Sequence, residues 1–70
     1  MNDLQHIILK KLKTYKTART ARQLFDVLAP KHKQLKSIQQ MNSNLTALWD
    51  ANHIRLVKTK PNAYVPRSSR

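Results

Sequence analysis

Residues 37–54, SIQQMNSNLTALWDANHI, decide how this chain is expected to fold. Ser37 followed three residues later by Gln40 matches a capping box, a pattern that marks the start of a helix. Apolar residues then recur at helical spacing on one side of the stretch, namely at Ile38, Met41, Leu45, Leu48 and Trp49. The stretch therefore predicts a helix over residues 38–51, with Trp49 as a core anchor at its end.

The other face of this predicted helix is rich in amide and hydroxyl side chains and almost free of charge. The major groove of DNA accepts one helix, and amide side chains can pair there with the edge of adenine, while hydroxyls can contact bases or phosphates. The residues expected to read base edges are Gln39, Gln40, Asn42, Ser43 and Thr46. The alternative for each of them is a solvated position with no ligand.

Two further helices are predicted upstream. Residues 3–14 carry an apolar stripe at the helical period, with lysines off the stripe. Thr20 and Gln23 form another capping-box pattern, so a second helix should begin directly after Thr20. Pro30 should end that helix, because the residue before a proline avoids the helical region. The basic segment that follows predicts a turn with Leu35 directed inward.

A two-stranded hairpin is predicted after the third helix. Asn52 is expected to take the left-handed conformation that closes the helix. Ile54, Leu56 and Lys58 alternate with Arg55, Val57 and Thr59 as in a strand, a turn containing proline follows, and residues 63–65 form a second run. We therefore expect one domain over residues 1–66 and a basic disordered tail over residues 67–70.

The charge of the chain points to a polyanionic partner. Its 70 residues contain 14 Lys+Arg against 3 Asp+Glu, a net charge of +11. A surplus of this size repels itself, and nucleic acid is the commonest partner that neutralises it. The residues expected to contact the DNA backbone are Arg19, Arg22, Lys31, Lys33, Lys36, Lys58, Lys60 and Arg67. Lys10, Lys11 and Lys13 are expected to lie away from the DNA.

Several other classes of function lack support in the sequence. There is no cysteine, the three histidines are scattered, and the only carboxylates are three aspartates, with no phosphate loop or nucleophile motif. We therefore expect no metal, no cofactor, no small-molecule substrate and no enzymatic activity. No apolar run approaches the roughly 18 residues of a membrane span, and no signal peptide is evident. The expected location is the cytoplasm, in association with the nucleoid.

The order of the predicted elements resembles the winged helix-turn-helix domain over essentially the whole chain. The segments that carry the resemblance are TARQLFDVL (20–28), the stretch 37–54 quoted above, and RLVKTKPNAYVP (55–66). The resemblance implies an α+β fold of three helices with a C-terminal two-stranded β-hairpin as the wing. It also implies a small bacterial or phage regulator of transcription that binds specific sequences of double-stranded DNA. Its third helix would enter the major groove, and the basic hairpin would contact the backbone.

A weaker resemblance links the chain to Z-DNA-binding alpha domains, through ILKKLK, TARQL, QMNSNLTAL and a proline before an aromatic residue in the hairpin. It places Asn42 at the helix asparagine of that family, Pro61 at a wing proline and Tyr64 at the wing aromatic. Two positions depart from the family, since Thr46 stands where the recognition helix carries a tyrosine and one of the paired wing prolines is missing. Z-form nucleic-acid binding is therefore an alternative function.

Other interpretations of the same features stay open. Tyr64 either packs on the third helix or offers its ring to a sugar or base. A plain three-helix bundle with a disordered tail is the competing fold. A small phage-type basic protein that binds and inhibits a host protein is the competing function, and a homodimer or a partner protein is compatible with either.

Overall fold

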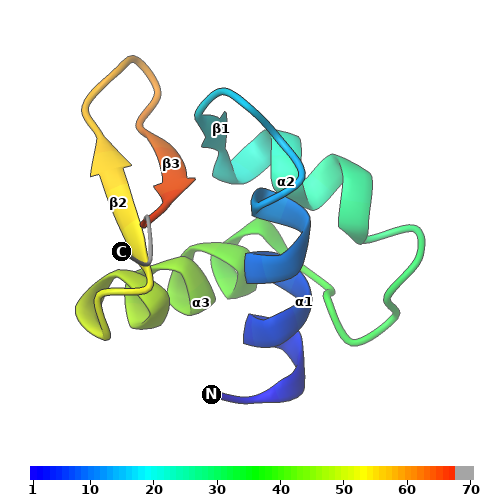
Figure 1. The fold of residues 1–70 in the computed structure, drawn as a ribbon. Helices are drawn as coiled ribbons and strands as arrows, with labels where there is room; N and C mark the ends of the chain where they lie inside the picture. The colour runs from blue at the N-terminus through cyan, green and yellow to red at the C-terminus, as the bar shows by residue number, and fades with distance from the viewer. Residues whose placement is uncertain (68–70) are drawn as a thin grey trace.

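The three predicted helices are all present in a computed structural model that describes residues 1–67. They are α1 (Asp3–Leu12), α2 (Ala21–Leu28) and α3 (Ile38–Asp50). Each begins at the expected residue, whereas α1 ends two residues and α3 one residue before the predicted end. In Figure 1, α1 crosses α3, and α2 passes the carboxyl end of α1.

Side-chain caps fix where the helices begin. Thr20 Oγ1 accepts a hydrogen bond from the Gln23 N–H (3.1 Å), and Gln23 Oε1 accepts one from the Thr20 N–H (3.0 Å). This reciprocal pair confirms the capping box predicted for α2. Asn2 and Gln5 make the same arrangement at the start of α1, which the sequence analysis did not anticipate.

The capping box predicted at the start of α3 is only half formed. Ser37 Oγ accepts from the Gln40 N–H (3.1 Å), as expected. The Gln40 side chain, however, accepts from the backbone N–H of Lys36 (2.6 Å) and donates to the carbonyl of Gln34 (2.7 Å). Gln40 therefore ties the preceding loop to the helix instead of closing the box on Ser37.

The predicted hairpin is present as β2 (Ile54–Val57) and β3 (Ala63–Pro66), but the sheet has a third strand. This strand, β1 (Arg19–Thr20), pairs antiparallel with β3, so the strand order is β1-β3-β2. The expectation of a sheet of two strands is thereby corrected. Two residues are too few to show an alternating pattern, and Thr20 already carries a capping signal. Asn52 takes the predicted left-handed conformation, with φ of 65°.

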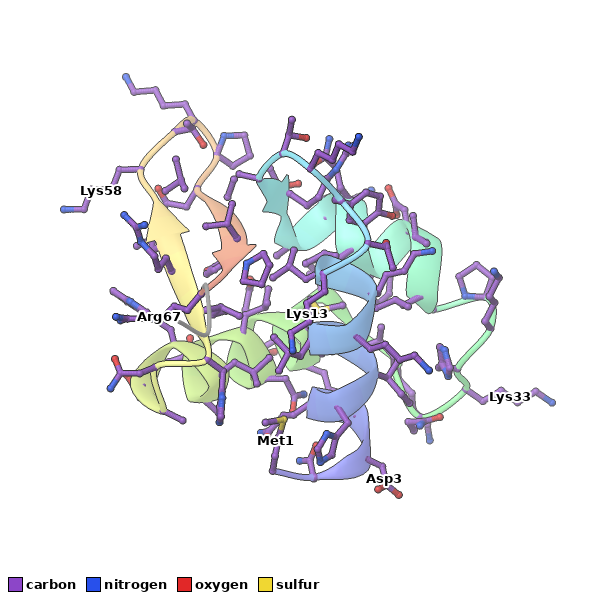
Figure 2. All side chains as sticks on the ribbon, viewed as in Figure 1. Met1, Asp3, Lys13, Lys33, Lys58 and Arg67 are labelled. Atoms are coloured by element: carbon purple, nitrogen blue, oxygen red, sulfur yellow. The ribbon has the colours of Figure 1, made fainter. Side chains whose placement is uncertain are left out.

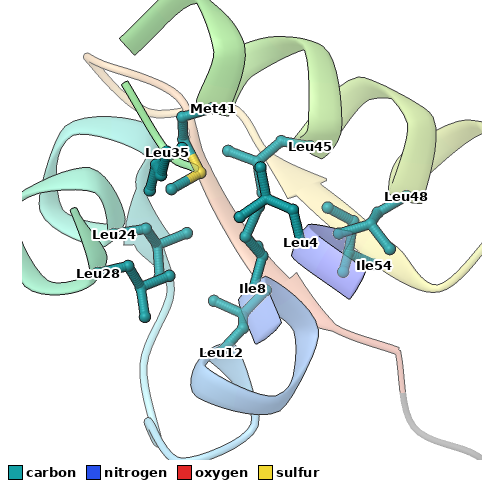
Figure 3. Packing of buried hydrophobic residues seen from close by; sticks show 10 residues of the cluster. All are labelled: Leu4, Ile8, Leu12, Leu24, Leu28, Leu35, Met41, Leu45, Leu48 and Ile54. Atoms are coloured by element: carbon teal, nitrogen blue, oxygen red, sulfur yellow. The ribbon is translucent and has the colours of Figure 1, made fainter. Parts of the chain in front are cut away.

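The apolar stripes of the helices meet in one core. Lysine side chains such as Lys33 and Lys58 extend outward from the ribbon (Figure 2), and no polar or charged residue among residues 1–67 is buried. Figure 3 shows the core cluster, which consists of Leu4, Ile8, Leu12, Leu24, Leu28, Leu35, Met41, Leu45, Leu48 and Ile54. Leu35 is 3% exposed, which confirms that the loop before α3 turns it inward.

Trp49 is not the core anchor that the sequence predicts, because its side chain is 45% exposed. Leu48, which precedes it, is buried, and Trp49 lies about 100° further around the helix. It also belongs to the last turn of α3, which extends beyond α1 (Figure 1). The inner face of α3 is therefore formed by Met41, Leu45 and Leu48.

The end of the described chain returns to the carboxyl end of α3. The backbone N–H of Arg67 donates to the carbonyl of His53 (3.1 Å), at the base of the hairpin. Residues 68–70, the rest of the predicted tail, lie outside the described residues. None of the three helices in residues 1–67 is long and apolar enough to cross a membrane.

Candidate nucleic-acid interface

The outward face of α3 is a row of exposed polar side chains. Because Met41, Leu45 and Leu48 are buried, the positions between them are directed toward solvent. The exposed residues at spacings i, i+3, i+4 and i+7 are Gln39, Asn42, Ser43 and Thr46. These are four of the five residues that the sequence predicts to read bases, and they present an uncharged face of amide and hydroxyl groups.

Gln40, the fifth of these residues, is half-buried and differs in its surroundings. Both ends of its amide bind backbone groups of the loop before α3. Its backbone carbonyl also accepts a hydrogen bond from Asn44 Nδ2 (2.8 Å). The structure thus gives Gln40 a part in fixing the start of the helix, and its amide is not free on the outer face.

A groove of about 280 Å³, which we call the junction groove, lies beside this face, where α2, α3 and the hairpin meet. It is lined by Thr20, Ala21, Arg22, Ile38, Asn42, Pro61, Asn62 and Tyr64. Three residues predicted for separate roles, Arg22, Asn42 and Tyr64, therefore come together from three elements. The lining contains one cation and no carboxylate, so the groove favours an anionic or neutral polar ligand.

Tyr64 takes part in both the core and the groove. In the β-ladders it stands opposite Arg19 on one side and Leu56 on the other. Residues directly opposite one another share a face of the sheet, and Ile54, two residues from Leu56, is buried on that face. Tyr64 thus faces the helices, where it is half-buried against the core, and it also lines the groove. Packing against the core is therefore present, whereas contact of the ring with a sugar or base stays a prediction.

Arg19 lies on the same inward face and stacks on Tyr15. Its guanidinium carbon is 4.3 Å from the centre of the Tyr15 ring, a cation–π arrangement. Its Nε atom is buried without a hydrogen-bond partner among residues 1–67. The structure therefore draws Arg19, predicted to contact phosphates, toward the end of α1, and it is not one of the residues lining the groove.

The other predicted backbone contacts are spread over different sides of the molecule. Lys58 and Lys60 lie near the tip of the hairpin, whereas Arg67 lies at its base beside His53. Lys33 and Lys58 extend toward opposite sides of the view in Figure 2. Only some of the residues predicted to contact the DNA backbone therefore lie around the junction groove.

Arg22 and Lys36 lie close to the starts of the two helices that border the groove. Arg22 is in the first turn of α2 and is paired with Asp26 (3.5 Å), the single ion pair within residues 1–67. Both of these side chains are more than half exposed, so the pair is screened by water and leaves Arg22 available to a stronger anion. Lys36 is exposed directly before the N-cap of α3.

Four residues that line the groove were not assigned to the site from the sequence, namely Thr20, Ala21, Ile38 and Asn62. Thr20 was visible as a helix cap, Ile38 as part of an apolar stripe, and Asn62 as part of a turn. Pro61 was singled out only through the resemblance to Z-DNA-binding alpha domains. The pairing of β1 with β3 brings the start of α2 beside the hairpin. No local signal in the sequence marks that pairing, so the contact between the start of α2 and the hairpin could not be predicted from the sequence.

No group of three His, Cys, Asp or Glu side chains within the described part of the chain could hold a metal ion. A scan against protein-family models gives no match, and a search of curated proteins finds no significant relative.

Proposed function

We propose that this protein binds specific sequences of double-stranded DNA as a winged helix-turn-helix regulator of transcription. The observation that carries the proposal is the junction groove, which unites Arg22 of α2, Asn42 of α3 and Tyr64 of β3 without a carboxylate. Its position beside the exposed polar face of α3, in a chain of charge +11, suits a polyanion with readable edges.

In the proposed complex α3 enters the major groove. Gln39 and Asn42 have amide groups whose geometry matches adenine N6 and N7, while Ser43 and Thr46 can contact bases or phosphates. These four side chains are exposed along one face of α3, so one helix can present them together. This face would provide the sequence reading.

The basic side chains around the junction would hold the backbone. Arg22 and Lys36 flank the starts of α2 and α3, and the hairpin carries Lys58 and Lys60 as the wing. Contacts of this kind dominate affinity and position the protein, but they carry no sequence information. The proposal therefore assigns sequence reading to α3 and backbone contact to the hairpin, and these two roles can be tested separately.

The test is a titration of a generic duplex at several salt concentrations. Roughly five to eight phosphate contacts would give a log-log slope of affinity against salt of about −4 to −7, because bound counterions are released. A slope shallower than about −2 would reject DNA as the main partner. It would instead favour the alternative of a basic protein that acts on an acidic protein surface.

Z-form nucleic acid is the second candidate, favoured by one observation. Asn42, Pro61 and Tyr64, the three residues that carry the resemblance to Z-DNA-binding alpha domains, all line the same groove. Thr46, which stands at the tyrosine position of that family, is exposed on α3 and lacks an aromatic ring. Circular dichroism of an alternating dC·dG duplex separates the two candidates, since only a Z-form binder converts its spectrum to that of the left-handed helix.

A further inference from the structure

A second groove, of about 340 Å³, lies between α1 and the carboxyl end of α2. Ile7, Val27 and Leu28 give it an apolar floor, on which Ile7 and Val27 are half-buried and Leu28 is buried. Its margin carries Lys10 and Lys11 from α1 and Lys31 from the loop after α2. The volume lies within the range of about 300 to 1,000 Å³ typical of binding pockets.

This groove is separate from the candidate nucleic-acid interface. The junction groove begins at Thr20 and Arg22, at the amino end of α2, whereas this one lies at the other end of the same helix. The two share no lining residue. Lys31, which the sequence predicts to contact DNA, lines this second groove. Lys10 and Lys11 line it as well, and neither of them contacts DNA in the proposed complex.

The electrostatics of the groove are unbalanced. No carboxylate lines it. The single ion pair within residues 1–67 joins Arg22 to Asp26, so none of the three lysines of the groove has a carboxylate partner among these residues. Lys11 lies 5.7 Å from the centre of the Tyr15 ring, which neutralises none of its charge. Three cations therefore surround an apolar floor, a pattern complementary to a ligand that is apolar on one side and anionic at its edges.

We propose that this groove binds an acidic amphipathic helical segment of a partner protein. Apolar side chains of the segment would cover Ile7, Val27 and Leu28, and its carboxylates would face Lys10, Lys11 and Lys31. Nucleic acid suits the lysines but not the floor, because a duplex presents phosphates and sugars that gain nothing from apolar contact. The proposal concerns a second surface and is independent of DNA binding through the junction groove.

A direct test measures the binding of a fluorescent synthetic peptide to the full chain. The peptide carries leucines at positions i, i+3, i+4 and i+7 of a helix and glutamates elsewhere, and its control has serines in place of the leucines. We expect the leucine peptide to bind at least about tenfold more tightly than the serine peptide. Equal binding of the two would overturn the proposal, because net charge alone would then explain it.

Two double variants with the same change in charge locate the site. Lys10→Glu with Lys31→Glu alters the margin of the groove, whereas Lys58→Glu with Lys60→Glu alters the hairpin, and all four lysines are exposed. The first pair of substitutions should lower the affinity for the leucine peptide by at least about tenfold, and the second pair should lower it by about twofold or less. Similar losses in both would overturn the proposal.

The same variants keep this proposal distinguishable from the proposed function. Because all four lysines are exposed, the substitutions leave the core unchanged, and circular dichroism checks that each variant is folded. Duplex binding by the two double variants reports on the wing, and peptide binding reports on the second groove. If the chain discriminates between the peptides but shows no salt-dependent duplex binding, the peptide-binding proposal is supported and the proposed function is rejected.

Discussion

At the residue scale, Asn42 and the hairpin lysines have different expected tasks. Asn42 lines the junction groove from the outer face of α3, whereas Lys58 and Lys60 are exposed near the hairpin tip. A base-edge contact releases no counterion, but each phosphate contact releases about one. The two kinds of contact can therefore be separated by measuring specificity and salt dependence on the same variants.

We expect Asn42→Ala and Gln39→Ala to lower the ratio of specific to non-specific affinity while leaving the salt slope almost unchanged. Lost base contacts typically cost about 1 to 3 kcal/mol of discrimination. The measurement is competition binding between a selected duplex and a generic one at several salt concentrations. Variants that lose affinity equally for both duplexes would contradict the assignment of α3 as the element that reads the sequence.

We expect the double variant Lys58→Ala with Lys60→Ala to show the opposite behaviour. It should weaken all duplexes about equally and flatten the salt slope by up to about 2 units, one for each lost phosphate contact. The same competition assay serves as the readout, with Lys33→Ala, on the far side of the molecule, as the control. A slope unaffected by the loss of both lysines would remove the hairpin from the interface.

Trp49 is a residue for which structure reverses the prediction from sequence. Because its side chain is 45% exposed, Trp49→Ala should cost about 1 kcal/mol or less of unfolding free energy. Leu45→Ala, on the buried face of the same helix, should cost about 2 to 5 kcal/mol, enough to unfold a domain this small. Thermal melts followed by circular dichroism compare the two. Equal destabilisation would place Trp49 in the core.

At the scale of elements, Gln40 links α3 to the loop that precedes it. Its amide makes two hydrogen bonds to backbone groups, from Lys36 and to Gln34. Gln40→Ala should therefore lower the unfolding free energy by about 1 to 2 kcal/mol, since loss of the amide leaves both groups to water. Gln39→Ala, at the neighbouring exposed position, should stay within about 0.5 kcal/mol. Urea midpoints measure both, and a larger loss for Gln39→Ala would contradict the assignment.

The elements differ in how far the sequence could predict them. The helices carry local signals, such as the Thr20 cap and the stripe through Met41 and Leu45, and the structure confirms them. Strand β1 and the inward direction of Arg19 depend on pairing with β3, which is distant in the sequence. The outer face of α3 was predictable for the same reason as its inner face, whereas the lining of the junction groove was not.

At the scale of the whole molecule, like charges dominate. The net charge is +11, and residues 1–67 contain one ion pair, between exposed Arg22 and Asp26. Repulsion within the folded state is long-ranged at low salt, and it is screened over about 8 Å at physiological ionic strength. The electrostatic contribution to stability is therefore governed more by repulsion between like charges than by ion pairing.

We expect the melting temperature of the free protein to rise by several degrees as sodium chloride is increased from low to physiological concentration. Screening weakens the repulsion, and the single exposed ion pair has little stability to lose. Differential scanning calorimetry measures the change, and a neutral osmolyte at matched osmolality is the control. A falling melting temperature would mean that attractive charge pairs outweigh the repulsion.

The pairing of Arg19 and Thr20 with Tyr64 and Ala63 also has a kinetic consequence. Contacts within helices form early because their partners are near in the chain, whereas this ladder must close a loop that includes both α2 and α3. The junction groove is lined by residues of both strands, Thr20 and Tyr64, so it should assemble late in folding and open early in unfolding. A ligand seated there would act as a brace, lengthening the lifetime of the folded protein by slowing its unfolding.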